Sequence, residues 1–324
     1  MNSFKEALRK IYLSYLNDNV DHSELNAATQ SYKKLLFDWY SNHFSNELDP
    51  ENLASEYGTA ISSLGAASCI EDGYRTRQFI RGISKALDQK LTYKGPIHVV
   101  YAGTGPFANL LLPIFQEYAQ FDIHYTLVEI NPPSFTILKR LMEEFNQSEF
   151  EIKLKLADAS KLKIPFDERP DIIISETMQA GLRAEPQVAI LQNLIPQAKN
   201  NAFIIPQNIK LSLGLIAQPK ASNLTQQEVV YREYPVFETI NFSSTVDSFS
   251  SVHTQIQEKD LLINSCLALL TEIRVFEDEL IQMNQSGLTV PLKLMDLPDE
   301  QATNYSIISR YQLKPKPELI IKMM

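Results

Sequence analysis

The sequence predicts an α/β protein whose parallel sheet is preceded by a helical part and followed by a β-rich part. Between residues 93 and 200, short apolar runs alternate with helical patterns, which is typical of a parallel sheet. Residues 1–92 instead repeat apolar side chains at the 3.6-residue spacing of helices. Residues 201–324 contain short alternating runs between turn-rich spacers, which favours a β-barrel or sandwich. We therefore expect three parts with these boundaries.

Two amphipathic stripes predict the first helices. One comprises Phe4, Leu8, Ile11, Tyr12, Tyr15 and Leu16, and the other comprises Tyr32, Leu35, Leu36, Trp39 and Tyr40. Aromatic stripes of this kind more often form a core than a binding surface, so we expect these side chains to be buried. After them, residues 65–72 lead into a further helix that carries Arg75.

A glycine turn follows the first predicted strand of the sheet. Residues 97–102 form a β-run, and Gly103, Thr104 and Gly105 come directly after it. Glycines let the backbone approach a ligand closely. We expect an apolar helix over residues 109–118, whose N-terminus would offer free N–H groups to that ligand. A lone Gly-x-Gly is a weak signal, which a simple turn explains equally well.

Acidic residues end the next two predicted strands and strengthen that signal. Residues 123–128 are followed by Glu129, at a position where nucleotide-binding α/β sheets commonly bind ribose hydroxyls. Residues 151–157 are followed by Asp158 and Ala159, where a carboxylate would meet an adenine amino group. The expected helices of this part cover residues 132–145 and 185–198. Successive strand ends with Gly-x-Gly, Glu and Asp therefore predict a nucleotide-like ligand.

Two glutamates flank the loop after the fourth predicted strand. Residues 171–174 have the composition of a buried strand, so Ser175 and Glu176 emerge at its carboxyl end. Glu185 follows nine residues later, and Gly181 allows the loop to turn back toward Glu176. Two carboxylates in one pocket repel each other, which raises the pKa of one of them, unless a cation joins them. A planar guanidinium is the best-matched cation among the common side chains.

Alternating runs predict the strands of the C-terminal part. They cover residues 210–217, 237–242 and 267–276, with turn-rich spacers at residues 243–245 and 284–287. Of the five histidines, only His253 lies in this part, and we expect it at the surface. The segment contains no repeat and no low-complexity tract.

The strand ends together resemble those of the class I S-adenosylmethionine-dependent methyltransferases, and more narrowly those of the protein arginine methyltransferases. The double-Glu loop of that family has the form Ser-Glu-x-Met followed by a Leu and a second Glu. The matching residues here are Ser175, Glu176, Met178, Leu182 and Glu185. The family's Asp-x-x-Arg-Thr-x-x-aromatic motif is matched by Asp72, Arg75, Thr76 and Phe79. The match covers roughly residues 70–215 with motifs and the remainder by pattern only.

The resemblance implies a Rossmann-like methyltransferase sheet, a C-terminal β-barrel and S-adenosylmethionine as cofactor. It implies that Arg75 grips the carboxylate of the cofactor's methionine part; the alternative is a solvated arginine in the first turn of a helix. The expected cofactor-binding residues are Arg75, Tyr101, Gly103, Thr104, Gly105, Glu129, Asp158 and Ala159. Glu176 and Glu185 are the expected catalytic residues. A homodimer is compatible with the same resemblance.

This chain departs from the family's pattern at several positions. Tyr101 stands where the first motif usually has an acidic residue, and Phe107 replaces its third glycine. Thr177 follows the first glutamate, where a bulky residue is usual. The Thr-His-Trp loop that closes the arginine pocket is missing, since the only tryptophan is Trp39. The cofactor half of the site is thus better supported by sequence than the acceptor half.

Composition narrows the class of protein. The 44% hydrophobic and 21% charged residues are ordinary for a globular chain, and no apolar stretch approaches the ~20 residues that span a bilayer. The net charge of −9 speaks against a nucleic-acid-binding surface. Cys69 and Cys266 are far apart and show no metal-ligand spacing, which indicates buried thiols in a reducing compartment. With no signal-peptide pattern, we expect a cytoplasmic protein.

The sequence therefore predicts an S-adenosylmethionine-dependent N-methyltransferase that acts on a guanidino or amino group. The acceptor is either an arginine-like small molecule or a protein arginine, a cationic substrate in both cases. One alternative is aminocarboxypropyl transfer from the same cofactor, because Gly-Thr-Gly-Pro-Phe at residues 103–107 resembles the Gly-Ser-Gly-Pro-Leu turn of nicotianamine synthases. A second alternative is a catalytically silent binding module that retains the fold.

Overall fold

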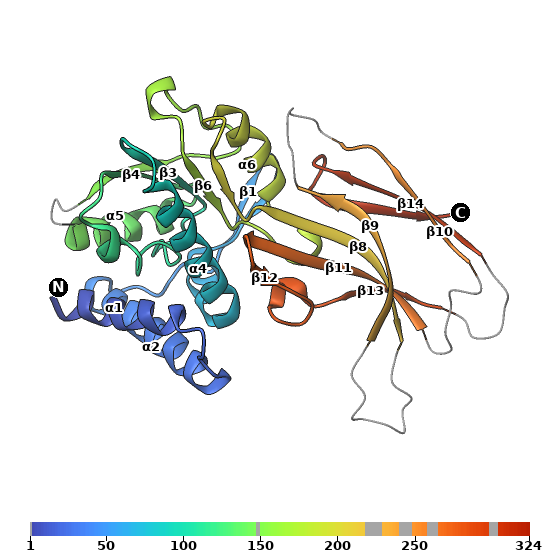
Figure 1. The fold of residues 1–324 in the computed structure, drawn as a ribbon, viewed down its shortest axis with the longest axis horizontal. Coiled ribbons are helices and arrows are strands. Elements are labelled where there is room, and N and C mark those ends of the chain that lie inside the picture. Colours follow the sequence, from blue (N-terminus) through green and yellow to red (C-terminus); the bar gives the residue numbers. More distant parts are fainter. Residues whose placement is uncertain (1, 147–149, 218–228, 240–247, 258–264, 298–303) are drawn as a thin grey trace.

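Two halves lie side by side in the computed structural model, an α/β half on the left and an antiparallel β half on the right of Figure 1. The structure describes residues 2–146, 150–217, 229–239, 248–257, 265–297 and 304–324. The N-terminal helices lie under the α/β half, and the C-terminus lies in the β half. None of the helices in this described part of the chain is long and apolar enough to cross a membrane.

The α/β half is built on a five-stranded parallel sheet in the order β5-β4-β3-β6-β7. Its strands are β3 (Ile97–Ala102), β4 (Ile123–Glu129), β5 (Glu151–Leu156), β6 (Ile172–Ser175) and β7 (Phe203–Ile205). The predicted parallel sheet is confirmed. The strand order reverses on either side of β3, and open α/β sheets bind ligands in the crevice at such a point. The last strand, β7, lies just beyond the expected boundary at residue 200.

The helix predicted over residues 109–118 is wrong. The chain makes a series of turns after Gly105, and only Phe115–Tyr118 form a short 3-10 helix, η2. Ala108 has a φ of 46°, a left-handed conformation that interrupts a helix. Pro113 has no N–H to donate to the carbonyl of Asn109, which instead accepts the Tyr32 hydroxyl at 2.7 Å. A helix N-terminus is therefore absent from this side of the cavity.

The N-terminal part consists of helices and one small hairpin. Its elements are α1 (Asn2–Leu16), α2 (His22–His43), β1 (Leu53–Ser55), β2 (Gly58–Ala60), α3 (Ser63–Ser68), η1 (Cys69–Glu71) and α4 (Gly73–Lys90). The predicted stripes are buried except for Leu16 and Leu35, which are partly buried, and Tyr15, Tyr32 and Leu36 are inaccessible to solvent. The hairpin was not predicted, because its strands have only three residues each and no run of β-branched side chains.

Helices cover the sheet and connect its strands. They are α5 (Pro132–Asn146), α6 (Gln187–Leu194) and the short 3-10 turns η3 (Phe166–Glu168), η4 (Ala180–Leu182) and η5 (Ile195–Gln197). The helix expected over residues 132–145 is confirmed. The one expected over residues 185–198 begins two residues later, because Pro186 stands at its N-cap, and it ends in η5.

The C-terminal half contains two antiparallel sheets, as predicted. One has the order β12-β11-β8-β9 with β13 also paired to β11, and the other has the order β10-β14-β15. The strands are β8 (Asn208–Ala217), β9 (Val229–Glu238), β10 (Val252–Ile256), β11 (Ser265–Phe276), β12 (Glu279–Ile281), β13 (Leu292–Asp296), β14 (Tyr305–Gln312) and β15 (Glu318–Met323). Phe237 on β9 stacks on Tyr311 on β14, with ring centroids 4.4 Å apart, and so joins the sheets.

Most expected C-terminal strands are found. Residues 210–217 and 267–276 lie in β8 and β11. Of the strand expected over residues 237–242, the first two residues end β9, whereas residues 240–242 and the spacer at 243–245 lie outside the described residues. The spacer at 284–287 is a turn that enters a 3-10 helix, η7 (Gly287–Thr289), and His253 is exposed as expected.

Helix α4 fastens the β half to the α/β half. Gly82 lies against Val275 so closely that a Cβ there would be 2.7 Å from Val275 Cγ1. Gln78 Nε2 donates to the carbonyl of Leu280 at 3.0 Å, and Arg81 Nε donates to Glu279 at 2.9 Å. These contacts fix α4, which carries Arg75 near its N-terminus, against the β half.

Candidate functional site

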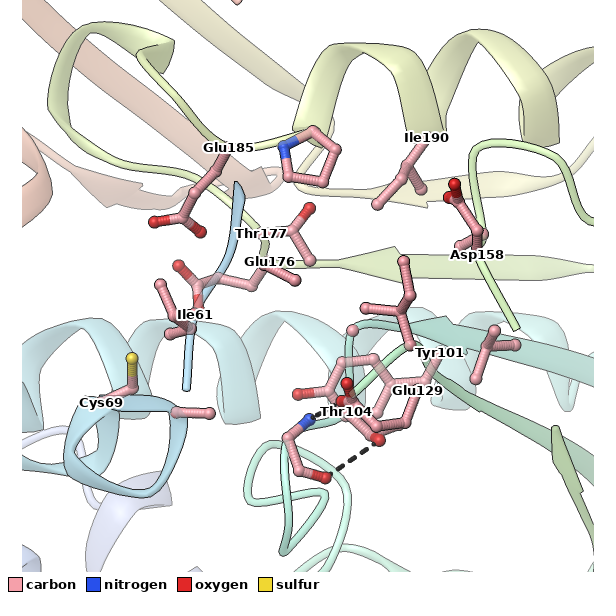
Figure 2. Close-up of a pocket in the computed structure, with 18 of the residues that line it drawn as sticks. Ile61, Cys69, Tyr101, Thr104, Glu129, Asp158, Glu176, Thr177, Glu185 and Ile190 are labelled. Atoms are coloured by element: carbon pink, nitrogen blue, oxygen red, sulfur yellow. Dashed lines mark hydrogen bonds between the residues drawn. The ribbon is translucent and has the colours of Figure 1, made fainter. Parts of the chain in front are cut away.

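A cavity opens at the carboxyl ends of β3, β4, β5 and β6. Of the ten residues predicted for the site, nine line this cavity: Tyr101, Gly103, Thr104, Gly105, Glu129, Asp158, Ala159, Glu176 and Glu185. In Figure 2 the two glutamates of the loop lie at one end and Asp158 at the other, with Tyr101 and Glu129 between them.

The glycine turn forms part of the cavity wall because its backbone must bend sharply there. Gly103 and Gly105 have φ values of 76° and 61°, which favour glycine. A Cβ on Gly103 would be 2.1 Å from Thr177 Cγ2, so no larger residue fits. The N–H of Gly103 donates to the carbonyl of Val128 at 2.9 Å, which ties the turn to the adjacent strand.

Glu129 ends β4 with a buried carboxylate. Its Oε2 accepts the N–H of Gly105 at 2.7 Å, and its Oε1 accepts the N–H of Asn131 at 2.8 Å. Burial raises the pKa of Glu129, while these backbone hydrogen bonds act in the opposite direction. A carboxylate has about four lone-pair sites, so Glu129 retains capacity to accept hydroxyls from a ligand.

Asp158 stands at the far end of the cavity, in the turn after β5. Its Oδ1 accepts both the N–H and the hydroxyl of Ser160, at 2.9 and 2.6 Å. Within the described residues, the second oxygen, Oδ2, accepts no hydrogen bond. The side chain is half-buried at the cavity rim. Ala159 beside it is buried and leaves the floor of this end apolar.

Glu176 is joined to Arg75 behind the cavity wall. Arg75 Nη1 lies 3.3 Å from Glu176 Oε1, and Nη2 donates to the carbonyl of Cys69. Arg75 is only 6% exposed, which excludes the solvated arginine, and it does not line the cavity itself. Its Nε is buried and has no hydrogen-bond partner in the described part of the chain. A buried donor without a partner is costly, so this guanidinium is suited to a further acceptor.

The two loop glutamates converge as predicted (Figure 2). Burial raises the pKa of Glu176 to about 6, against the opposing effect of Arg75. Burial raises the pKa of Glu185 to about 7, and the charge of Glu176 adds to that rise. The sequence led us to expect repulsion as the main cause; burial is the larger one, because the pocket removes water from both carboxylates.

Gln187 at the start of α6 positions the residues around Glu176. Its Oε1 accepts the N–H and hydroxyl of Thr177, both at 2.9 Å, and its Nε2 donates to the carbonyl of Ser175 at 3.0 Å. The side chain is inaccessible to solvent. Since Glu176 lies between the two residues that Gln187 holds, its backbone is fixed on both sides.

The loop that returns to Glu185 is held in a strained conformation. Leu182 and Ala184 have φ values of 52° and 63°, a left-handed region that costs non-glycine residues energy. The carbonyl of Leu182 accepts the Tyr311 hydroxyl at 2.6 Å, and the N–H of Gly181 donates to Thr271 at 3.0 Å. These partners come from the β half, so both halves of the molecule shape the site.

Several cavity residues were not predicted from the sequence. They include Ala60, Ile61, Ala66, Cys69, Thr177, Pro186 and Ile190. Ile61 and Cys69 lie beside the loop glutamates in Figure 2, although they precede the sheet by many residues. No local pattern marks them, because an apolar residue after an irregular hairpin resembles any core residue. Among them, only Thr177 was marked in the sequence, because it stands after Glu176 where the resembled family usually has a bulky residue.

Comparison with solved structures places this architecture among known folds. The chain is similar to that in the crystal structure of PRMT6-SAH, with a TM-score of 0.52 and 10% sequence identity over 79% of this chain and 98% of that chain. A Trypanosoma brucei PRMT1 enzyme-prozyme heterotetrameric complex with AdoHcy matches at a TM-score of 0.46 and 13% identity, over 79% of this chain and 96% of that chain. The sequence matches no family model and no curated protein. The fold that the resemblance implied is confirmed.

Proposed function

We propose that this protein is an S-adenosylmethionine-dependent N-methyltransferase that acts on a guanidino or amino group. The observation that carries the proposal is the convergence of Glu176 and Glu185 at one end of a cavity whose other walls are the glycine turn, Glu129 and Asp158. Such a cavity offers two carboxylates to a cationic acceptor, beside the part lined by the glycine turn, Glu129 and Asp158. The PRMT6 structure with the same fold is named for its complex with SAH, which supports the choice of cofactor.

The cofactor residues fit a nucleoside joined to an amino acid. Glu129 would accept ribose hydroxyls, and Asp158 would accept the adenine amino group with its second oxygen. The glycine turn leaves room for the methionine part. Arg75 lies behind the wall at that end, and its unpartnered Nε would bind the carboxylate of that part after the side chain turns toward the cavity. When bound, the cofactor supplies an electrophilic methyl group on sulfur. The protein's own task is then to align the acceptor nitrogen with that methyl group.

The loop glutamates would prepare the acceptor. A guanidinium is protonated near neutral pH, and its nitrogens are poor nucleophiles in that state. Glu176 and Glu185 would hold the cation in one orientation and keep its positive charge away from the attacking nitrogen. Glu185, whose pKa burial raises to about 7, is suited to accept the departing proton. Glu176 remains the partner of Arg75.

Two measurements test the proposal. Calorimetry with S-adenosylhomocysteine should show binding, and no heat at millimolar ligand would remove the methyltransferase assignment. Mass spectrometry after incubation with S-adenosylmethionine and a metabolite extract should then find S-adenosylhomocysteine. Methylthioadenosine in its place would indicate aminocarboxypropyl transfer. The cytoplasmic location and the homodimer stay predictions from the sequence.

A further inference from the structure

A strap, defined as residues 53–61, lies directly on the loop between the two catalytic glutamates. A Cβ on Gly58 would be 2.0 Å from the carbonyl oxygen of Ala184, so backbone packs on backbone there. The N–H of Thr59 donates to that carbonyl at 2.7 Å. On the other side, the N–H of Ala184 donates to the carbonyl of Pro317 at 2.9 Å. The protein's own chain therefore occupies both polar backbone groups of Ala184, next to Glu185.

The tip of the strap is joined to both halves of the molecule. Glu56 Oε2 lies 2.7 Å from Lys161 Nζ, in the turn after Asp158, and Glu56 Oε1 lies 3.0 Å from Lys314 Nζ. The two ammonium groups lower the pKa of Glu56 to about 2. Lys314 also lies over the Tyr57 ring, 5.0 Å from its centroid. One exposed ion pair contributes little stability alone, but these two together fasten the tip of the strap to both halves.

The end of the strap lines the cavity beside the glutamates. Ala60 and Ile61 are part of its wall, and Figure 2 shows Ile61 close to Glu176 and below Glu185. The Glu176 side chain is 10% exposed and Glu185 is 7% exposed. With the strap in place, solvent reaches only a small part of either carboxylate.

A polypeptide acceptor needs room for its backbone within one side-chain length of the glutamates. Next to Glu185, Gly58 and Thr59 of the strap occupy the space on one side of Ala184, and Pro317 occupies the space on the other. A peptide there would also find no unpaired backbone group on Ala184 with which to pair. A free small cation needs neither the space for a backbone nor the backbone pairing, and it can reach the two carboxylates through the cavity that they line.

We propose that the acceptor is a free small molecule that carries a guanidinium or amine, because the strap excludes polypeptide arginines from the loop glutamates. The proposal rests on the function proposed above and narrows its substrate class. It makes the strap the specificity-determining element, with Glu56 as the residue that holds it closed. The two lysines that bind Glu56 act as its partners from the α/β and the β half.

Cys69 gives a test that does not depend on knowing the acceptor. Its thiol lines the acceptor end of the cavity, whereas Cys266 is buried in β11. The full-length protein is labelled with a small maleimide or with a polymer-linked maleimide, and mass spectrometry measures the rate at Cys69. Burial raises the pKa of this thiol, but the ratio of the two rates is independent of that effect because the reactive group is the same.

We expect the small reagent to label Cys69 at least ~10-fold faster than the polymer reagent, because the strap leaves no room for a polymer chain beside a concave site. Glu56→Lys places three ammonium groups together and should therefore release the strap. The polymer reagent should then label Cys69 about as fast as the small reagent. Glu51→Lys makes the same charge change at an exposed position just before the strap and should leave the ratio unchanged. Equal rates in the unaltered protein would overturn the proposal. Labelling by neither reagent would also overturn it, because the cavity would then admit no small molecule.

A second arm compares acceptors directly. Free arginine, agmatine and a set of simple amines are incubated with S-adenosylmethionine beside arginine-containing peptides. We expect methylated product from the free compounds only, and we expect Glu56→Lys to raise any peptide product. Peptide product at a comparable rate in the unaltered protein would overturn the small-molecule assignment but leave the methyltransferase intact. Loss of S-adenosylhomocysteine binding would instead refute the proposed function itself.

Discussion

The two ends of the cavity, which we propose to bind the cofactor and the acceptor, are built in different ways. The cofactor end consists of residues that directly follow β3, β4 and β5, namely the glycine turn, Glu129 and Asp158. The acceptor end combines the loop after β6 with the strap, Cys69 and turns from the β half. Regular secondary structure alone brings the first set together, whereas tertiary packing has to assemble the second.

This difference has consequences for how each end works. Parallel strands place their carboxyl ends in one line, so the cofactor residues need little further support. The acceptor loop adopts left-handed conformations at Leu182 and Ala184 and is held there by Tyr311, Thr59 and Pro317. Strain of this kind persists only where surrounding structure fixes it, and it is typical of functional sites. Variants at the two ends should therefore separate cofactor affinity from turnover.

The largest effect is expected at the acceptor end. Glu176→Gln and Glu185→Gln should each lower kcat by about 10²- to 10⁴-fold, the usual contribution of acid–base catalysis. Both variants should bind S-adenosylhomocysteine normally, since an amide retains the size of the carboxylate. The double variant should be little worse than either single one if both groups hold one cation. Near-normal kcat in both single variants, measured by product mass spectrometry, would refute the clamp.

The pH dependence of turnover should be the next largest effect. The pKa values of Glu176 and Glu185 are raised to about 6 and about 7, and only the ionised carboxylates can hold a cation or accept a proton. Lowering the pH from about 8 to about 5 leaves roughly 1% of Glu185 ionised, so kcat should fall about 100-fold. The apparent pKa belongs to the coupled pair. A flat profile across this range would show that neither carboxylate titrates in the reaction.

The same shifts affect stability in the opposite direction. The folded-state pKa values of both glutamates lie above the ordinary value of 4.5, so the folded protein holds more protons than the unfolded chain between about 4.5 and 7. The contribution of these residues to the free energy of unfolding should therefore fall as the pH rises through this window. Thermal unfolding of Glu185→Gln beside the unaltered protein measures it, because the amide does not titrate.

The sequence predicted the residues of the cofactor end better than those of the acceptor end. The strands, the glycine turn, Glu129 and Asp158 were predicted, because each signal directly follows the apolar run of its own strand. The strap and Ile61 were not, because three-residue strands carry no periodicity and the partners of the strap lie far along the chain. The helix expected over residues 109–118 failed for a local reason, the left-handed Ala108 and Pro113, which an apolar run conceals.

Arg75 lies between the two ends and should affect both. Arg75→Lys should weaken S-adenosylhomocysteine binding almost as much as Arg75→Ala, by ~2–5 kcal/mol, the usual cost of breaking a buried charge pair. Lysine cannot reach Glu176, the carbonyl of Cys69 and a ligand at once with a point charge. Arg77→Lys on the same helix is the control, since Arg77 bonds the distant carbonyl of Asn17. An Arg75→Lys variant that is fully active and binds S-adenosylhomocysteine in calorimetry as tightly as the unaltered protein would contradict the cofactor role.

At the cofactor end, Glu129→Ala should weaken S-adenosylhomocysteine binding by ~1–3 kcal/mol, the cost of losing hydrogen bonds to a charged group. Part of this loss reflects the N–H groups of Gly105 and Asn131, which then lack their acceptor. Glu151→Ala, at the opposite end of the same sheet, serves as the control. With cofactor at saturation, kcat of Glu129→Ala should return to near its normal value. Unchanged affinity in calorimetry would place the ribose elsewhere.

The smallest effect is expected at Gln187, which touches neither acceptor nor cofactor and acts by positioning Glu176. Gln187→Leu keeps the volume but removes the acceptor of Thr177 and the donor to Ser175, bonds that contribute ~0.5–1.5 kcal/mol each. We expect kcat to fall about tenfold and its pH profile to shift, while the affinity for S-adenosylhomocysteine stays within a few-fold. Gln192→Leu on the same helix is the matched control, because Gln192 is equally buried and its Nε2 has no hydrogen-bond partner in the described chain. If both variants lose the same stability and neither changes kcat, Gln187 only supports the fold. The acceptor loop would then be held in its geometry by the strap and the β half alone.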